Sequence, residues 1–240
     1  MKSLIGHYFK NYLLVKEDKQ NFYFKAKTGP SRITKIPKYL SEDLSSFVGI
    51  IIGDGHLTKG RKRISVELTD VILLRKIKDL IRSLFGISCK IYQKTNVRPN
   101  KQISYYFQVD NSMIYSLLHL VFEVPKGRKS RKVRIPVLIR KGSTKYKIAF
   151  LIGLFATDGG KRHGNRAGLS TASRLLRDDI SLLLKELKIK HYLDEWLYKK
   201  YKRRYFGLYF TKKSIAPLMQ GCRSGQTDRI LDSFLKKIGG

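Results

Sequence analysis

The chain has 240 residues, which suits one large domain or two domains of about 100 to 120 residues each. Its 50 lysines and arginines against 18 aspartates and glutamates give a formal net charge of +32. So large an excess repels itself in the compact state and favours a polyanionic partner, for which charge alone leaves DNA and RNA as equal candidates. A ribosomal or membrane-surface protein would show the same excess.

Composition excludes several classes of protein. There is no run of about 18 apolar residues that would predict a transmembrane helix, and residues 1–10 lack the apolar segment of a signal peptide. Cys89 and Cys222 form neither a disulfide framework nor a zinc-binding spacing, and the five histidines are scattered. We therefore expect an intracellular protein without a membrane partner, in the cytoplasm or nucleoid of a prokaryote or in an organelle.

The chain begins with a segment that has no counterpart further on. Residues 1–40 mix aromatic and basic side chains, and we interpret them as an N-terminal extension packed on the core or on nucleic acid. A first half, residues 41–125, follows. Its residues 47–55 read FVGIIIGDG, a buried-looking helix that ends in Asp54 and a glycine. Apolar periodicity then predicts a strand, a helix, two strands and a helix at residues 63–68, 71–85, 88–94, 103–109 and 112–122.

A basic segment joins this half to the rest of the chain. Residues 126–140 are dense in lysine and arginine and contain Pro136. They form either a solvated linker or a linker that lies along phosphates, and their charge favours the second interpretation.

The second half, residues 141–240, repeats the order of the first. Residues 151–159 read LIGLFATDG, and Asp158 lies 104 positions after Asp54, since 158 − 54 = 104. The elements that follow are again a strand, a helix, two strands and a helix interrupted at Pro217, at residues 167–171, 175–187, 191–198, 205–210 and 214–220. A duplication with small insertions explains the match.

The two nonapeptides have the pattern of a helix interface. In a helix, Gly49 and Gly53 lie on one face at spacing i, i+4, as do Gly153 and Thr157. Such small residues allow two helix backbones to approach closely, as in a G-x-x-x-G pair. The repeated glycines imply a packing reason, because glycine inside a helix is unfavourable by about 0.5–1 kcal/mol relative to alanine.

The aspartates then end the two helices, with Gly55 and Gly159 expected as caps. A carboxylate at the negative end of a helix is unfavourable, and two of them brought together are worse. A divalent cation such as Mg²⁺ would relieve both effects. The alternative is that each Asp-Gly pair is an ordinary turn after a buried helix, which two copies in one basic chain disfavour.

Both nonapeptides resemble the motif of the LAGLIDADG homing endonucleases, in the single-chain form with two copies, over about residues 40–238. The resemblance implies an α+β fold of two pseudo-symmetric αββαββα halves, with the motif helices packed at a pseudo-twofold axis. Antiparallel sheets would form a DNA-binding saddle. The implied function is metal-dependent cleavage of both strands of a double-stranded DNA target of roughly 20 base pairs by a monomer, leaving short 3′ overhangs.

The resemblance also implies a catalytic site. Asp54 and Asp158 would bind Mg²⁺, with the carbonyl groups of Gly53 and Thr157 as further ligands. Mn²⁺ would substitute for Mg²⁺, whereas Ca²⁺ would support binding only. Lys161 would act as a catalytic lysine soon after the second motif.

Further residues carry over from the family. Glu67 would orient water in the first half, and Ser170 or a neighbour would do so in the second. Lys129, with Lys132 as second choice, would complete the site. Leu68 stands where some relatives have lysine, so the first half must find its cation elsewhere. His56, beside Gly55, could lie near a metal, although a surface or hydrogen-bonded histidine is the more ordinary interpretation. The expected contacts to DNA come from strand residues: Arg61, Arg63, Lys90, Tyr92, Lys94, Gln108, Lys199, Arg203 and Tyr205.

The alternative function is an RNA-binding maturase that assists splicing of its host intron on the same scaffold. A pure binding protein has no need of both acids, so Asp54 and Asp158 favour the intron-encoded nuclease. The target DNA sequence cannot be derived from the chain.

Overall fold

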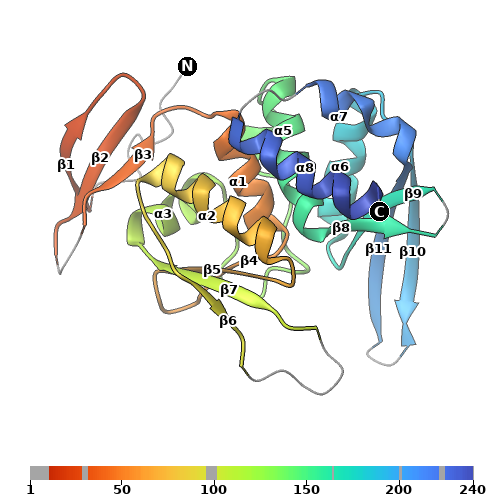
Figure 1. Ribbon diagram of the computed structural model, residues 1–240, viewed down its shortest axis with the longest axis horizontal. Helices are drawn as coiled ribbons and strands as arrows, with labels where there is room; N and C mark the ends of the chain where they lie inside the picture. The colour runs from red at the N-terminus through yellow and green to blue at the C-terminus, as the bar shows by residue number, and fades with distance from the viewer. Residues whose placement is uncertain are drawn as a thin grey trace.

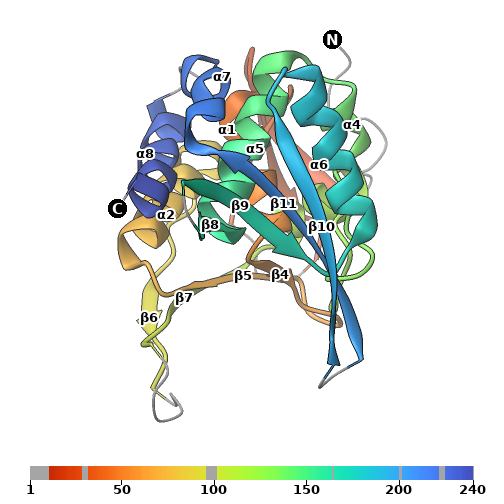
Figure 2. The same ribbon diagram turned by 90° about the vertical axis from the view of Figure 1, so that its right-hand side faces the viewer.

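In the computed structural model, two similar assemblies of helices and strands lie side by side, with the helices on one side and the sheets diverging on the other (Figures 1 and 2). The structure describes residues 11–28, 32–95, 102–163, 165–199, 202–221 and 225–239. Among these residues, no helix combines the length and the apolar character needed to cross a bilayer.

Two apolar helices pack together at the centre. Helix α1 spans Glu42–Ile52 and helix α5 spans Thr144–Asp158. The Ser41 side chain caps α1 by accepting a hydrogen bond from the backbone N–H of Leu44, at 3.1 Å. Both helices are apolar on all sides over most of their length, which is typical of helices buried on all sides.

The first half contains a four-stranded antiparallel sheet in the order β4-β5-β7-β6. Its strands are Gly55–Leu57, Arg63–Leu68, Tyr105–Asp110 and Ile91–Gln93, in that order. Helix α2, Val71–Phe85, begins at Asp70, whose carboxylate accepts from two backbone N–H groups at 2.9 Å, and ends at Gly86 with φ +70°. Its apolar stripe packs on the inner face of the sheet, because alternate strand residues are buried there.

The second half contains the matching sheet in the order β8-β9-β11-β10. Its strands are Gly159–Arg162, Arg166–Thr171, Arg203–Thr211 and His191–Tyr198. Helix α6, Arg174–Glu186, covers the inner face. The β10–β11 hairpin is long and extends away from the helices (Figure 2).

The strand registers establish which residues of the two halves are equivalent. In the first sheet, Gly55 after the motif aspartate pairs with Val66. In the second sheet, Gly159 pairs with Leu169. Glu67 and Ser170, one residue further along their strands, therefore occupy the same position in the two halves.

The N-terminal segment forms a sheet of its own. Strands β1 (Tyr12–Glu17), β2 (Asn21–Ala26) and β3 (Thr34–Pro37) pair in that order and pack on the first half (Figure 1). The Tyr12 hydroxyl donates to the carbonyl of Ser112 at 3.1 Å. The described part of this segment thus lies against the first half, and its role as an extension packed on the core or on nucleic acid stays a prediction.

Several predicted elements differ in detail. The strand expected at 88–94 is reduced to Ile91–Gln93, and the helix expected at 112–122 is a short helix α3, Ser112–Ser116, followed by a π-helical turn η2, Leu117–Val121. Pro217 does not interrupt a helix at 214–220. After a 3₁₀ turn η4 (Lys212–Ile215), it lies in the first turn of α7 (Ala216–Gln220), where its missing N–H does no harm.

Two helices were not predicted. A short helix α4, Val137–Arg140, lies within the linker, and α8, Gly225–Gly239, ends the chain. Helix α8 crosses to the first half, where the backbone N–H and hydroxyl of Thr227 donate to the Asp43 carboxylate at 3.2 and 2.9 Å. The division into segments at residues 40, 125 and 140 stays a prediction.

Candidate active site

The two motif helices touch through their backbones. A Cβ atom added to Gly49 would collide with the carbonyl oxygen of Phe150, and one added to Gly153 would collide with the carbonyl oxygen of Ser46. Gly53 faces the Thr157 hydroxyl in the same way. The spacing of small residues therefore brings the C-terminal ends of α1 and α5 together.

The two helices end differently beside their aspartates. Helix α1 stops at Ile52, and the N–H of Gly53 donates to the Gly49 carbonyl at 2.9 Å. Gly53, with ψ near −100°, is thus the C-cap. The expectation that Gly55 caps this helix is wrong, because α1 ends at Ile52, three residues before Gly55. In the second half Gly159 does cap α5, as expected.

Asp54 and Asp158 meet at this junction and share a side-chain hydrogen bond. Burial raises the pKa of both carboxyls, and the charge of Asp54 contributes to raising that of Asp158 to about 7. Lys129 and Lys237 are the cations that act in the opposite direction on both groups. Without further positive charge, two ionised carboxylates are therefore unfavourable here.

Lys129 comes from the linker and caps helix α1. Its ammonium donates to the carbonyl oxygens of Ile51, of Ile52 at 2.7 Å and of Gly53 at 2.6 Å. Burial lowers its pKa to about 8. A cation at the negative end of a helix is favourable, so the lysine is held in place next to the aspartates. The first half thus obtains from the linker the cation that Leu68 does not provide.

Lys237 is the counterpart in the second half, and it was not predicted. From α8 its ammonium donates to the carbonyl oxygens of Ala156 at 3.4 Å and Thr157 at 2.9 Å, and burial lowers its pKa. A signal was present in the sequence. Lys129 follows its aspartate by 129 − 54 = 75 residues, and Lys237 follows its own by 237 − 158 = 79.

The positions next to this centre are occupied differently in the two halves. Glu67 lies near enough to raise the pKa of Asp54, and it accepts from Lys94 at 2.9 Å and from the Ser104 hydroxyl at 2.7 Å. At the equivalent position, the Ser170 hydroxyl accepts from Arg162 at 3.0 Å.

The other predicted residues lie at the edges. Lys161 is exposed on β8 opposite Ala167, and Lys132 is exposed in the linker. His56 is exposed on β4 opposite Ser65. The functional roles predicted for Lys161 and Lys132 stay predictions.

The residues predicted to contact DNA lie on or beside the outer sheet faces, away from the helices. Gln108 and Tyr92 are exposed there, and Arg63 forms an ion pair with Asp110, with both N–O distances 2.7 Å. In the second half, Tyr205 stacks on Trp196. Arg61, Lys90, Lys199 and Arg203 are exposed at strand ends and turns.

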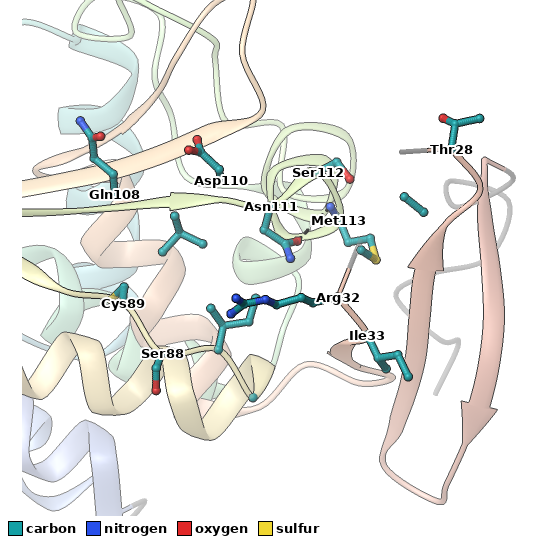
Figure 3. Close-up of a pocket in the computed structure, with 14 residues that line it drawn as sticks. Thr28, Arg32, Ile33, Ser88, Cys89, Gln108, Asp110, Asn111, Ser112 and Met113 are labelled. Atoms are coloured by element: carbon teal, nitrogen blue, oxygen red, sulfur yellow. Dashed lines mark hydrogen bonds between the residues drawn. The ribbon is translucent and has the colours of Figure 1, made fainter. Parts of the chain in front are cut away.

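A cleft of about 230 Å³ opens beside Asp158. Basic side chains line it together with Ser170: Lys129, Arg131, Arg203 and Arg204. A larger cavity of about 460 Å³ lies between the N-terminal sheet and the first half, where Arg32 and Asn111 point into it (Figure 3). The smaller cleft is the candidate site, because it alone of the two contains a motif aspartate.

The donor set fits a hard divalent cation. Two carboxyl groups and the carbonyl oxygens of Gly53 and Thr157 converge, and those carbonyls already accept hydrogen bonds from two ammonium groups. No group of three or more histidine, cysteine or acidic residues that could hold a metal is present in the described ranges, this pair of aspartates included. Mg²⁺ binds through one or two carboxylates plus water and phosphate oxygens, so a two-aspartate site is sufficient when nucleic acid is bound.

The chain matches a family model described as a LAGLIDADG-like domain over residues 42–121 and 145–239. It is also similar to longer proteins. One is a probable translation initiation factor IF-2 of Thermococcus kodakarensis, 28% identical over 160 residues, which are 65% of this chain and 13% of that protein. Another is a replication factor C small subunit of Methanocaldococcus jannaschii, 28% identical over 72% of this chain and 9% of that protein. The matched segment is thus less than a sixth of each relative.

Solved structures share the fold. The homing endonuclease I-WcaI, bound to its DNA recognition sequence, has a TM-score of 0.54 at 18% identity, over 83% of this chain and 87% of that chain. Variants of the homing endonuclease I-DmoI have a TM-score of 0.52 at 16% identity, over 78% of this chain and 96% of that chain. Full-length DUF199/WhiA from Thermatoga maritima has a TM-score of 0.52 at 17% identity, over 81% of this chain and 60% of that chain. These likenesses show an α+β fold of two repeated halves with α1 and α5 packed together.

Proposed function

This chain belongs to the LAGLIDADG-like domain family, and from that premise we propose that it is a homing endonuclease that cuts both strands of a specific DNA sequence with Mg²⁺. One observation carries the proposal: two aspartates with raised pKa values, one from each half, meet where two helix ends also direct carbonyl oxygens. A protein that only binds nucleic acid has no use for two such carboxyls, which oppose folding when both are ionised.

Asp54 and Asp158, with the carbonyls of Gly53 and Thr157, would hold the divalent ions. When bound, these ions would lower the pKa of water and neutralise charge on the scissile phosphates. Glu67 would accept a hydrogen bond from the attacking water and so orient it in the first half. Ser170 would do the same in the second half. Lys129 and Lys237 would stabilise the charge that develops on the phosphate oxygens. The outer sheet faces would hold the duplex.

Crystal structures of I-DmoI contain DNA with Ca²⁺ in one case and with Mn²⁺ in another. For this chain, we expect Ca²⁺ to support specific DNA binding without efficient cleavage, because its looser coordination positions the attacking water poorly. Adding Mg²⁺ or Mn²⁺ to that complex should start cleavage. The measurement is strand scission on a selected duplex, with binding followed in parallel by fluorescence anisotropy. Cleavage in EDTA at the rate seen with Mg²⁺ would rule out the metal mechanism.

The net charge of +32 predicts a steep salt dependence of DNA binding. If about 8 phosphates are neutralised, the logarithm of the association constant should fall with the logarithm of salt concentration at a slope of about −7. Non-specific duplex should show a similar slope, because phosphate contacts carry no sequence information. A selected site should keep an advantage of about 10³ or more.

A competition experiment separates this proposal from an RNA-binding maturase. At about 150 mM salt, where long-range attraction is largely screened, the selected DNA duplex should displace structured intron RNA from the protein. The opposite result, RNA winning by a wide margin and no cleavage of DNA with Mg²⁺, would overturn the nuclease.

A further inference from the structure

The outer faces of the two sheets differ in chemistry although their strands are in the same register. Glu67 pairs with Tyr106 in the first half, and its equivalent, Ser170, pairs with Gly207 in the second. Two residues further along the strand, Gln108 is therefore equivalent to Tyr209. The halves can be compared side chain by side chain from this alignment.

On the first sheet, the positions beside the active site are polar. The backbone N–H of Lys94 donates to the carbonyl of Ser104 at 2.9 Å, so these two residues continue the β6–β7 pairing. Both side chains bond to Glu67. With Gln108 they form a group of charged, hydroxyl and amide side chains that can exchange hydrogen bonds with base edges. The stacked rings of Tyr92 and Tyr106, with centroids 5.6 Å apart, lie on the same face.

The second sheet has aromatic rings at these same positions. Counting from Gly207, the equivalents of Ser104 and Lys94 are Tyr205 and Trp196, which pair across β11 and β10. Their rings are nearly parallel, at 17° with centroids 6.1 Å apart. We name the aromatic face by its five members: Tyr192, Trp196, Tyr198, Tyr205 and Tyr209.

The aromatic face is open to solvent and lies next to the candidate site. Tyr192 and Tyr198 are 47% and 46% exposed. A hollow of about 330 Å³ is lined by Ser170 and three members of the face: Trp196, Tyr198 and Tyr205. It borders the cleft of Asp158, since Ser170 and Tyr205 line both. Arg162 and Arg166 lie over the rings of Tyr209 and Tyr192, each at 5.9 Å.

Sheet stability alone explains only part of this arrangement. Cross-strand aromatic pairs do stabilise a sheet, and the Trp196–Tyr205 pair contributes in that way. A group of rings on the face opposite the helices, two of them about half exposed, is unfavourable in water and marks a surface that a partner covers. Arg162 and Arg166, which lie over two of the rings, favour an anionic partner such as DNA, although Asp194 also lies on this face.

The major groove of DNA presents a single apolar group, the C5 methyl of thymine. We infer that the second half selects thymine through methyl contacts with the aromatic face, whereas at the equivalent positions the first half, with Lys94, Ser104 and Gln108, reads hydrogen-bonding edges. The inference rests on the proposed function, because it assumes that the outer faces lie in the groove. It assigns Trp196, Tyr192 and Tyr209 a part in specificity.

The test uses a duplex selected from a randomised library in Ca²⁺, with thymines replaced by uracil in one half-site at a time. Uracil lacks only the methyl group. We expect each contacted methyl to contribute about fourfold in affinity, from about 0.8 kcal/mol per buried carbon group. The total uracil effect should be larger in the half-site bound by the second half. The variant combining Trp196→Lys with Tyr205→Ser installs the side chains of the first half at these two positions, and it should lower the uracil effect in the second half-site.

A control substitution lies on the same strand but on the opposite face. Leu197 is 56% exposed there, so Leu197→Lys should leave the uracil effect unchanged. If Leu197→Lys lowers the uracil effect as much as the double variant does, the effect is not a contact and the inference fails.

The wild-type protein alone can also contradict the inference. Equal uracil effects in both half-sites, no effect in either, or a selected second half-site without thymine would each overturn it while leaving specific binding intact. Selection of no duplex at all would overturn the proposed function, and this inference with it.

Discussion

Asp54→Asn and Asp158→Asn are each expected to abolish double-strand cleavage while DNA binding survives. Each change removes a carboxylate from the pair that would hold the metal, whose stabilisation of the reaction is worth several kcal/mol. A loss of about 4 kcal/mol corresponds to a cleavage rate lower by about 10³. Binding should persist or tighten, because a negative charge facing phosphate is removed. Single-turnover cleavage and anisotropy binding on one selected duplex measure both effects.

Asp178→Asn is the matched control. Asp178 is a half-exposed acid on α6 that pairs with Arg177 at 2.6 Å, away from the aspartate pair. The same chemical change there should leave cleavage at the parental rate. A second readout tests the repulsion within the pair: at pH 8 in EDTA, both active-site variants should unfold at temperatures no lower than the parent, because one of two repelling charges is gone. An aspartate whose replacement leaves both strands cut at the parental rate has been wrongly assigned.

Gly49→Leu and Gly153→Leu are expected to cause the largest loss of stability. The structure leaves no room for a Cβ atom at either position, since each would overlap a backbone carbonyl of the facing helix. A backbone cannot move aside as a flexible side chain can, so the overpacking should reach about 3 kcal/mol or prevent folding. For a chain of this size, about 3 kcal/mol lowers the melting temperature by roughly 6–12 °C. Thermal unfolding followed by circular dichroism is the measurement.

Gly49→Ala sharpens this experiment, because the Cβ atom alone already collides. The matched control is Gly225→Leu, at an exposed position at the start of α8 where nothing lies near an added Cβ. That variant should unfold close to the parent. Parental melting temperatures for Gly49→Leu and Gly153→Leu would mean that these glycines do not face a partner helix.

The sequence by itself determined the features that depend on residues close together in the chain. Two nine-residue patterns with Gly49, Asp54, Gly153 and Asp158 at fixed spacing identify two helices with an acid at or just after the C-terminal end, and their recurrence predicts two similar halves. Helix α2 was predicted with the bounds that it has, because its apolar stripe, the polar residue before it and Gly86 after it all agree. Such signals depend only on residues that are close together in the sequence. A single sequence is therefore sufficient to predict these elements.

Only the tertiary structure decided which distant residues join the site. Lys237 reaches the Thr157 carbonyl because α8 folds back across both halves, and no local periodicity encodes that path. The equivalence of Glu67 with Ser170 required the strand registers, which are set by long-range pairing. The same registers placed Trp196 where the first half has Lys94. Side chains far apart in sequence share a surface only after the backbone hydrogen bonds of a sheet have aligned them.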